Sequence, residues 1–291
     1  MAQAFLEEVI DQQHWLEPTG DVLQEAIGKV AGKEGTSRAI KDALHGVWLG
    51  HPLHPALTDI PIGAWSASLI LDILSLRGNR ALRRGADATL GIGIVGAVAS
   101  GIAGLADWQE TYGRERRIGL LHGLLNTTGL ALYTVSLVQR RRKQRGAGML
   151  FSLLGYSATL LSSYLGGELV FRQGVAVNHA AWLEKPAEFI PVMDEAKLPP
   201  DKPVRAMAGT TPVLLVRQGG MIYALAAVCT HAGGPLDEGE LHDGVIVCPW
   251  HGSNFSLEDG HVKAGPATMG EPAFEVRVRN GTIEVRAVNA D

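Results

Sequence analysis

The chain has 291 residues, enough for two ordinary domains, and a formal net charge of −4. That charge leaves no basic surface of the kind that binds nucleic acid, so nucleic acid is not expected among its partners. Charged residues make up 19 % of the chain, below the roughly 25 % of soluble domains. The apolar residues concentrate between about residues 56 and 171. These features predict a membrane-embedded half followed by a soluble half.

Residues 1–50 are expected to form short amphipathic helices that lie on the protein or on a bilayer surface. Apolar side chains recur there at helical spacing, at Val22, Leu23, Ala26, Ile27 and Val30. Thr36 or Ser37 is a candidate cap for a helix that ends near Gly46. The opening MAQAFLEEVIDQQ lacks the basic start and apolar run of a secretory signal peptide.

Four apolar stretches follow, and we expect them to cross a membrane. They cover residues 60–76, 89–106, 118–139 and 146–167, and only the first is interrupted by an acid, Asp72. A spanning helix needs about 20 apolar residues, so the first qualifies if Asp72 faces the bundle or its end. A soluble bundle of buried helices is the alternative, but four such stretches in a row leave no polar outer face. Residues 51–180 are therefore predicted to form a transmembrane bundle of four α-helical spans.

The basic residues between these stretches predict the orientation of the bundle. Arginines and lysines concentrate in 77–85 and 139–145, and the loop between them is less basic. An excess of Lys and Arg marks the cytoplasmic side. Both ends of the chain would then lie outside, at what we expect to be a bacterial plasma membrane.

The remaining residues are expected to form a linker over 181–200 and a soluble all-β domain over 201–291. Short alternating β runs such as VIVCPW and FEVRVRNGTIEVRAV are separated by turn residues. Gln218-Gly219-Gly220 and Asn280-Gly281 are hairpin signals. The fold class is therefore multi-domain, with a helical membrane part and small antiparallel sheets.

The β domain contains both cysteines of the chain, each next to a histidine. Cys229 and His231 form a C-x-H motif, and Cys248 and His251 form a C-x-x-H motif. Two thiolates and two imidazoles suit either Zn²⁺ or a [2Fe–2S] cluster with two His ligands on one iron. Zinc fingers usually place both Cys in one knuckle and both His in another. Two mixed knuckles favour two irons, each of which takes its own kind of ligand from both loops.

The two motifs together resemble the Rieske domain, and the resemblance covers about residues 190–290. It implies that Cys229 and Cys248 ligate the inner ferric iron. His231 and His251 would ligate the outer iron, which takes the electron. The potential would fall within roughly −150 to +300 mV.

Four positions near the ligands can be compared with the branch of the family found in cytochrome complexes. Three of them differ from that branch and one matches it. Gly234 and Trp250 stand where that branch has a disulfide-forming Cys in each loop. Ser253 matches a Ser that hydrogen-bonds the cluster, whereas Phe255 replaces a Tyr that does the same. The domain is therefore similar to Rieske ferredoxins, with a potential near the low end.

The membrane half resembles a predicted bacterial membrane-domain family of unknown function, in HPLHPALTDIP (51–61), LLHGLLN (120–126) and GGELVFRQGVAVNH (166–179). Alternating helix directions would gather seven ionisable residues at one membrane face: His51, His54, Asp59, Asp107, His122, Glu168 and His179. Two of the histidines could ligate a haem b, a His–carboxylate pair could hold a quinone or relay protons, or all could lie in headgroup water.

These features predict a membrane-anchored one-electron carrier rather than a self-contained enzyme. It would contact membrane lipid and exchange electrons with a redox partner protein or the quinone pool. One alternative is an electron-supplying component of a Rieske-type oxygenase or reductase system. The other is a zinc-stabilised binding module on a membrane anchor.

Overall fold

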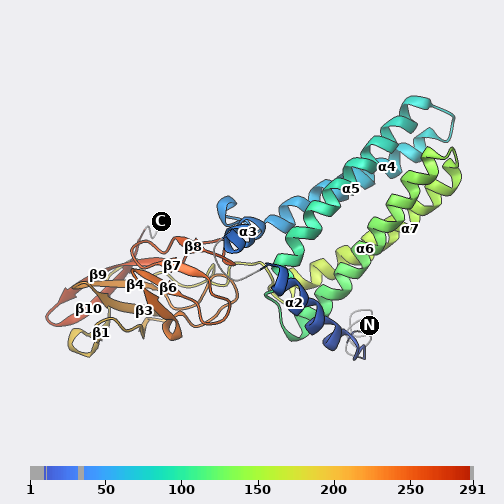
Figure 1. Ribbon diagram of the computed structural model, residues 1–291. Helices are drawn as coiled ribbons and strands as arrows, with labels where there is room; N and C mark the ends of the chain where they lie inside the picture. Colours follow the sequence, from blue (N-terminus) through green and yellow to red (C-terminus); the bar gives the residue numbers. More distant parts are fainter. Residues whose placement is uncertain (1–9, 11, 32–35, 289–291) are drawn as a thin grey trace. The chain divides into compact units, whose positions relative to one another are not determined.

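A computed structural model describes residue 10, residues 12–31 and residues 36–288. The first nine residues, part of the predicted amphipathic segment, lie outside the described residues. The chain divides into two compact units. We call Met1–Arg38 with Leu53–Val175 the helical unit, and Ala39–Pro52 with Ala176–Asp291 the β unit. Figure 1 shows the elements of each unit.

The helical unit contains four long helices that form two hairpins (Figure 1). Helix α4 (Leu53–Ser75) packs along α5 (Arg80–Trp108), and α6 (Gly113–Arg141) packs along α7 (Arg145–Phe171). The shorter α2 (Leu16–Ala31) packs against α6, where Glu17 accepts a hydrogen bond of 2.6 Å from Arg116. All four helices are long and apolar enough to cross a membrane, as predicted.

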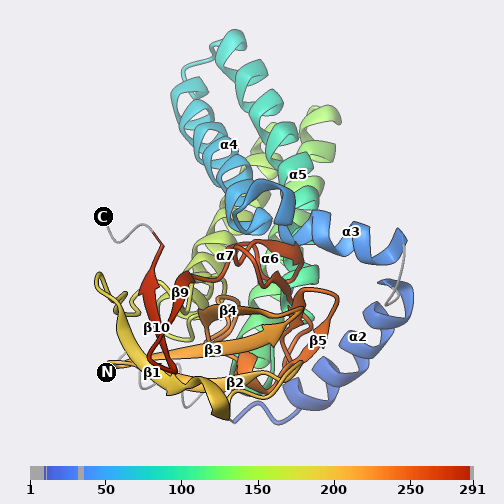
Figure 2. The ribbon, with the colours of Figure 1, turned by 90° about the vertical axis from the view of Figure 1, so that its left-hand side faces the viewer.

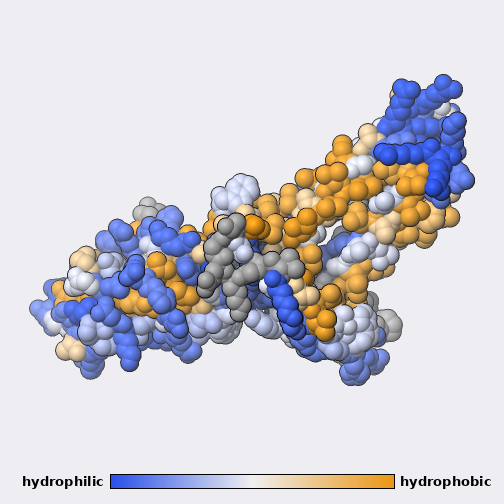
Figure 3. All heavy atoms as spheres, viewed as in Figure 1, coloured by the Kyte–Doolittle hydropathy of each residue, from blue (hydrophilic) through white to orange (hydrophobic). Residues whose placement is uncertain are grey.

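The outer surface of these helices is apolar (Figure 3). Large aliphatic side chains such as Val95, Leu105 and Leu161 are exposed along their lengths. Several small residues face inward, and Gly93 and Gly155 lie directly beneath aromatic rings of the neighbouring helix. This arrangement is typical of helices in lipid, where small residues allow close approach and apolar side chains face the acyl chains.

Ion pairs join the two hairpins near the α4–α5 and α6–α7 loops. Asp72 of α4 is 2 % exposed and accepts hydrogen bonds from Arg140 of α6 and Arg145 of α7. Arg140 also donates to Asp87 at 2.9 Å. The predicted inward position of Asp72 is confirmed, because each charge in this low-dielectric setting has an opposite charge within hydrogen-bond distance.

The β unit contains two antiparallel sheets (Figure 2). The larger has the order β1-β10-β9-β4-β3-β2, and the smaller has the order β5-β6-β7-β8. The strands are β1 (Ile190–Asp194), β2 (Val204–Ala208), β3 (Thr211–Gln218), β4 (Met221–Ala226), β5 (Glu240–His242), β6 (Val245–Val247), β7 (Asn254–Ser256), β8 (Val262–Ala264), β9 (Ala273–Arg279) and β10 (Thr282–Ala287). Both predicted hairpins form, with positive φ at Gly219, Gly220, Asn280 and Gly281.

The segment predicted as a linker contains a strand. Ile190–Asp194 forms β1, which pairs with β10 at the edge of the larger sheet. Its prolines suggested a linker, but an edge strand tolerates Pro191, because a proline there removes no hydrogen bond from a second neighbour. The register also shifts between Pro191 and Met193.

A second boundary differs from the predicted one. Residues 39–52, predicted as the end of the amphipathic segment 1–50 and the start of the membrane part, group with the β unit. This segment includes the end of α3 (Thr36–His45) and a short 3₁₀ helix at Val47–Leu49. Asp42 Oδ1 accepts a hydrogen bond of 2.9 Å from the backbone N–H of Gly265. A contact between residues so distant in sequence leaves no local signal.

We expect Asp72→Ala to destabilise the helical unit by about 3–5 kcal/mol, because it removes the buried carboxylate that pairs with both Arg140 and Arg145. Thermal unfolding in detergent would measure the effect. Asp59→Ala is the matched control, because Asp59 is an exposed acid on the same helix. Equal stability of the two variants would show that the ion pairs do not hold the hairpins together.

Candidate metal centre

Two loops of the β unit carry the cysteines, and their backbones close in the same way. The N–H of Cys229 donates to the carbonyl of Gly234, and the N–H of Gly233 donates to the carbonyl of Cys229, each at 2.8 Å. This closure bends the loop after β4 back on itself. Gly233 has φ 78, a left-handed conformation that favours glycine.

The second loop, between β6 and β7, repeats this pattern around Cys248. Its N–H donates to the carbonyl of Ser253 at 2.8 Å, and the N–H of Gly252 donates to its carbonyl at 3.0 Å. Gly252 has φ 71 and stands four residues after the cysteine, as Gly233 does in the first loop. Two loops of similar shape thus present a cysteine and a histidine each.

The four side chains converge. The rings of His231 and His251 have centroids 4.9 Å apart and are nearly perpendicular. Cys229 and Cys248 are buried, not joined in a disulfide, and hydrogen-bonded to each other. Nδ1 of His231 is buried with no hydrogen-bond partner among the described residues. A buried nitrogen with a free lone pair and two facing sulfurs fit a metal centre.

Electrostatics favour one thiolate in this pair of cysteines. The hydrogen bond from Cys229, together with backbone N–H groups of Trp250 and His251, lowers the pKa of Cys248 to about 6. The same hydrogen bond and burial raise the pKa of Cys229. Burial lowers the pKa of His231 to about 3, so its imidazole is neutral at pH 7. Thiolate and neutral imidazole are the forms that bind metal.

Gly234 and Trp250, which stand where the cytochrome-complex branch has its disulfide, lie against each other. A Cβ on Gly234 would lie 3.1 Å from the Trp250 ring and 3.0 Å from the Cys248 sulfur. The indole therefore fills the space beside the first loop, and a larger residue than glycine there would press against it. Packing of Trp250 on Gly234 joins the two loops without a covalent link.

Ser253 and Phe255 are both fully buried next to the second loop. The Ser253 hydroxyl accepts a hydrogen bond of 2.9 Å from the N–H of Ala267, so its own hydrogen remains able to donate. Phe255 belongs to the same apolar cluster as Cys229 and Cys248 and has no polar atom. One candidate donor to a sulfur is present, and the other is absent.

Three residues lie near the ligands that the sequence did not predict there. Glu271 and His45 were not predicted as site residues, and His179 was predicted for the membrane face instead. Glu271 accepts a hydrogen bond of 2.6 Å from the N–H of Thr230, and burial raises the pKa of its carboxyl to about 8. His45 and His179 interact electrostatically with His231. His179 donates its backbone N–H to the carbonyl of Thr230 at 3.1 Å. These contacts come from distant segments and have no motif.

The seven residues predicted for a membrane face fall into two groups. His54 and His122 lie close together in the helical unit, with ring centroids 6.2 Å apart. Glu168 in α7 forms an ion pair with Arg172 at 3.5 Å, and Asp59 is exposed. His51 and His179 belong to the β unit, and Asp107 lies in α5. The structure thus brings two of the seven together as a pair.

Two parts of the chain match known families. Residues 188–277 match the Rieske [2Fe-2S] domain, and residues 50–179 match a family described as a predicted membrane protein of unknown function. Ferredoxin CarAc of Metapseudomonas resinovorans is 38 % identical over 77 residues, which are 26 % of this chain and 72 % of that protein.

Other similarities cover a comparable share of the chain. Apoptosis-inducing factor 3 of Mus musculus is 36 % identical over 75 residues, 26 % of this chain but only 12 % of that protein. A solved ferredoxin of carbazole 1,9a-dioxygenase from Nocardioides aromaticivorans is 30 % identical, with a TM-score of 0.33. The match covers 34 % of this chain and 96 % of the solved ferredoxin.

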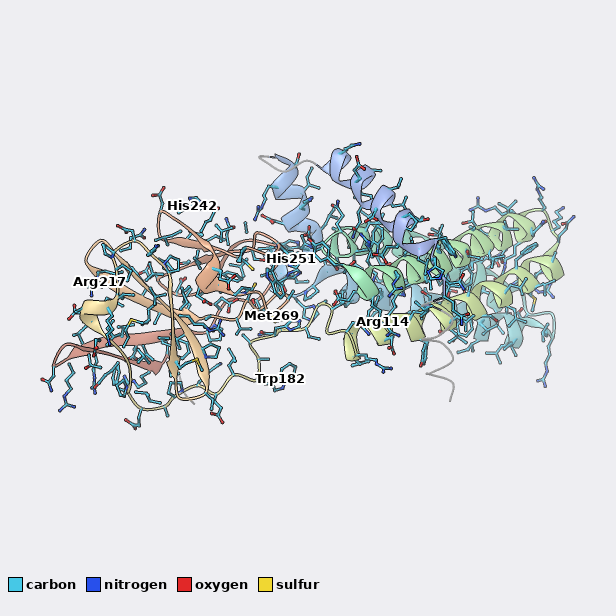
Figure 4. All side chains as sticks on the ribbon, turned by 90° about the horizontal axis from the view of Figure 1, so that it is seen from below. Arg114, Trp182, Arg217, His242, His251 and Met269 are labelled. Atoms are coloured by element: carbon cyan, nitrogen blue, oxygen red, sulfur yellow. The ribbon has the colours of Figure 1, made fainter. Side chains whose placement is uncertain are left out.

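We expect His231→Ala to abolish the [2Fe–2S] cluster and its acid-labile sulfide, because it removes one of the four converging side chains. His242→Ala is the matched control, because His242 is exposed and lies away from His251 (Figure 4). Iron and acid-labile sulfide per purified chain would be measured for both. A full iron content in His231→Ala would show that His231 is not a ligand.

Proposed function

The chain belongs to the Rieske [2Fe–2S] family, and from this we propose that it is a membrane-anchored one-electron carrier. The convergence of Cys229, Cys248, His231 and His251 at the tip of the β unit is the observation that carries the proposal. These residues would hold the cluster, which supplies reversible one-electron chemistry when bound. The four apolar helices would anchor the carrier in the membrane.

The arrangement of the ligands supports a two-iron cluster over the zinc alternative. Among the described residues, no three His, Cys, Asp or Glu side chains are gathered as ligands of one ion. The histidines lie side by side and the cysteines lie side by side, as two separate ligand pairs. A structural zinc site needs four ligands around one centre.

The protein residues set the conditions for electron transfer. Burial of both cysteines excludes water from the sulfur side, while His231 and His251 are only partly buried. An electron would therefore enter and leave on the imidazole side, where a partner can approach. Backbone N–H groups donate to both cysteine sulfurs, which stabilises negative charge there.

The family relatives support a second, finer proposal about the partner. Ferredoxin CarAc matches 26 % of this chain, and other relatives are named as ferredoxin components of dioxygenase systems. We propose that the partner is a redox protein, with an oxygenase or reductase component as the first candidate. The distribution of basic residues supports placing the β unit outside the cytoplasm.

An anaerobic redox titration of the full chain in detergent, followed by electron paramagnetic resonance, tests the function. We expect a one-electron wave of the iron–sulfur centre, with a resonance that is present in the reduced state. Ser253→Ala should lower the midpoint by about 40 mV, because one hydrogen bond is worth about 1 kcal/mol and a one-electron couple changes by 59 mV per tenfold. Phe255→Tyr should raise it if the new hydroxyl reaches a sulfur.

Ser256→Ala is the matched control for the titration. Its hydroxyl bonds to Asp259 rather than to the centre, so the midpoint should not change. A colourless protein that contains zinc and gives no wave would contradict the proposed function. An unchanged midpoint in Ser253→Ala would remove that serine from the site but leave the function standing.

A further inference from the structure

The helical unit is an internal repeat in which one hairpin copies the other. Residues of α4 have their equivalents 68 positions later in α6, and residues of α5 have theirs 62 positions later in α7. The hydrogen bonds follow the same offsets. Ser68 donates to the carbonyl of Ala86, and its equivalent Ser136 donates to the carbonyl of Gly148. The repeat is therefore structural as well as sequential.

Equivalent residues of the two repeats meet each other between the hairpins. Trp65 stacks on its equivalent, Tyr133, with ring centroids 3.9 Å apart. Asp72 forms its buried ion pair with its equivalent, Arg140. Contacts of a residue with its own counterpart lie on a two-fold axis. The hairpins are thus related by an approximate two-fold axis that runs along the helices, as in parallel repeats of transporters.

His54 and His122 are also equivalent residues, and they face each other at this axis. Their ring centroids are 6.2 Å apart and their planes are nearly perpendicular, at 87°. Each ring packs on a glycine of its own hairpin. A Cβ on Gly104 would lie 2.7 Å from His54, and one on Gly166 would lie 3.1 Å from His122. A larger residue at either glycine would displace the imidazole.

Both rings are held by the same hydrogen bond. Nδ1 of His54 lies 2.7 Å from the carbonyl oxygen of Ser100, and Nδ1 of His122 lies 2.9 Å from that of Ser162. A carbonyl only accepts, so each Nδ1 carries the hydrogen and each Nε2 keeps its lone pair. Metal-ligating histidines are oriented in this way, through a carbonyl on the other ring nitrogen.

We propose that His54 and His122 are the two axial ligands of a haem bound between the hairpins. A metal ion without its own ligands needs about four protein donors, whereas only two face each other here. A haem iron already has four porphyrin nitrogens and needs two imidazoles. With metal–nitrogen bonds of about 2 Å, imidazoles on opposite sides of one iron have centroids separated by roughly the observed distance.

The two hairpins contact each other only sparsely along the axis on which the pair lies. The next aromatic contact across the axis, Trp65 on Tyr133, begins eleven residues further along the helix, about 16 Å at 1.5 Å per residue. Packing is dense within each hairpin and sparse between them. Asn126 donates to Nε2 of His122 at 3.0 Å. Binding would break this one hydrogen bond and form two iron–nitrogen bonds, with no electron transferred.

The test uses the full chain expressed with a haem precursor, purified in detergent and supplied with hemin. We expect a sharp α band in the reduced-minus-oxidised spectrum and one haem per chain. His54→Ala and His122→Ala should each lose this band, while His51→Ala should keep it. His51 is the matched control, because its Nδ1 contacts the carbonyl of its own neighbour, Pro52. Asn126→Ala should also keep the band.

A conservative variant separates ligation from folding. His122→Met should keep the haem and raise its midpoint potential, because a Met/His pair has a higher potential than two His ligands. The resonance of the β unit, recorded in the same samples, should be unchanged in every variant, so loss of haem and loss of the cluster are distinguished. Absence of haem from the unaltered chain would overturn the proposal. Haem that persists in His54→Ala, or copper in its place, would do the same.

Discussion

Closure of the two cysteine loops is the constraint on which the metal centre depends. In each loop the N–H and the C=O of the cysteine both form backbone hydrogen bonds within six residues. A glycine in the left-handed conformation makes the turn. The cysteine thus cannot move away from its histidine without breaking two hydrogen bonds. One of these loops follows β4 of the larger sheet, and the other joins β6 to β7 of the smaller sheet. Because they have similar shapes, they can present their ligands to each other from opposite sides of the centre. The two sheets therefore need only to hold the ends of these loops at the correct distance from each other.

The helical unit holds its polar side chains in place by contacts between helices rather than by a closed loop. Polar groups in lipid must find partners within the protein, and this chain places them where the two hairpins meet. Asp72 and Arg140 satisfy each other in this region, one from each hairpin. Because the hairpins are copies, one sequence feature supplies both sides of each contact. At one pair of equivalent positions the first hairpin has an acid, Asp72, and the second has a base, Arg140. Identical charges at these two positions would repel each other, whereas opposite charges form an ion pair.

Much of this architecture follows from local sequence, and the exceptions have one cause. Four apolar stretches, two hairpin turns and the C-x-H and C-x-x-H motifs each depend on nearby residues, and all are found in the structure. Strand β1 was missed because its prolines suggest a linker unless its place at a sheet edge is known. Glu271 and His45 reach the centre only through tertiary packing, which a single sequence does not reveal. The repeat is faint in sequence because only a few equivalent positions keep the same residue.

The contact between Gly234 and Trp250 shows why the loops need no disulfide. A disulfide restrains the unfolded chain and is rare where thiols are kept reduced. Here the indole packs across the first loop, and the space of the missing side chain at Gly234 admits it. Packing of this kind holds the loops together in any redox environment. It also leaves Trp250 partly exposed beside His251, with centroids 6.4 Å apart. The surface next to the histidines is therefore aromatic, as in interfaces where a partner buries a flat apolar side chain.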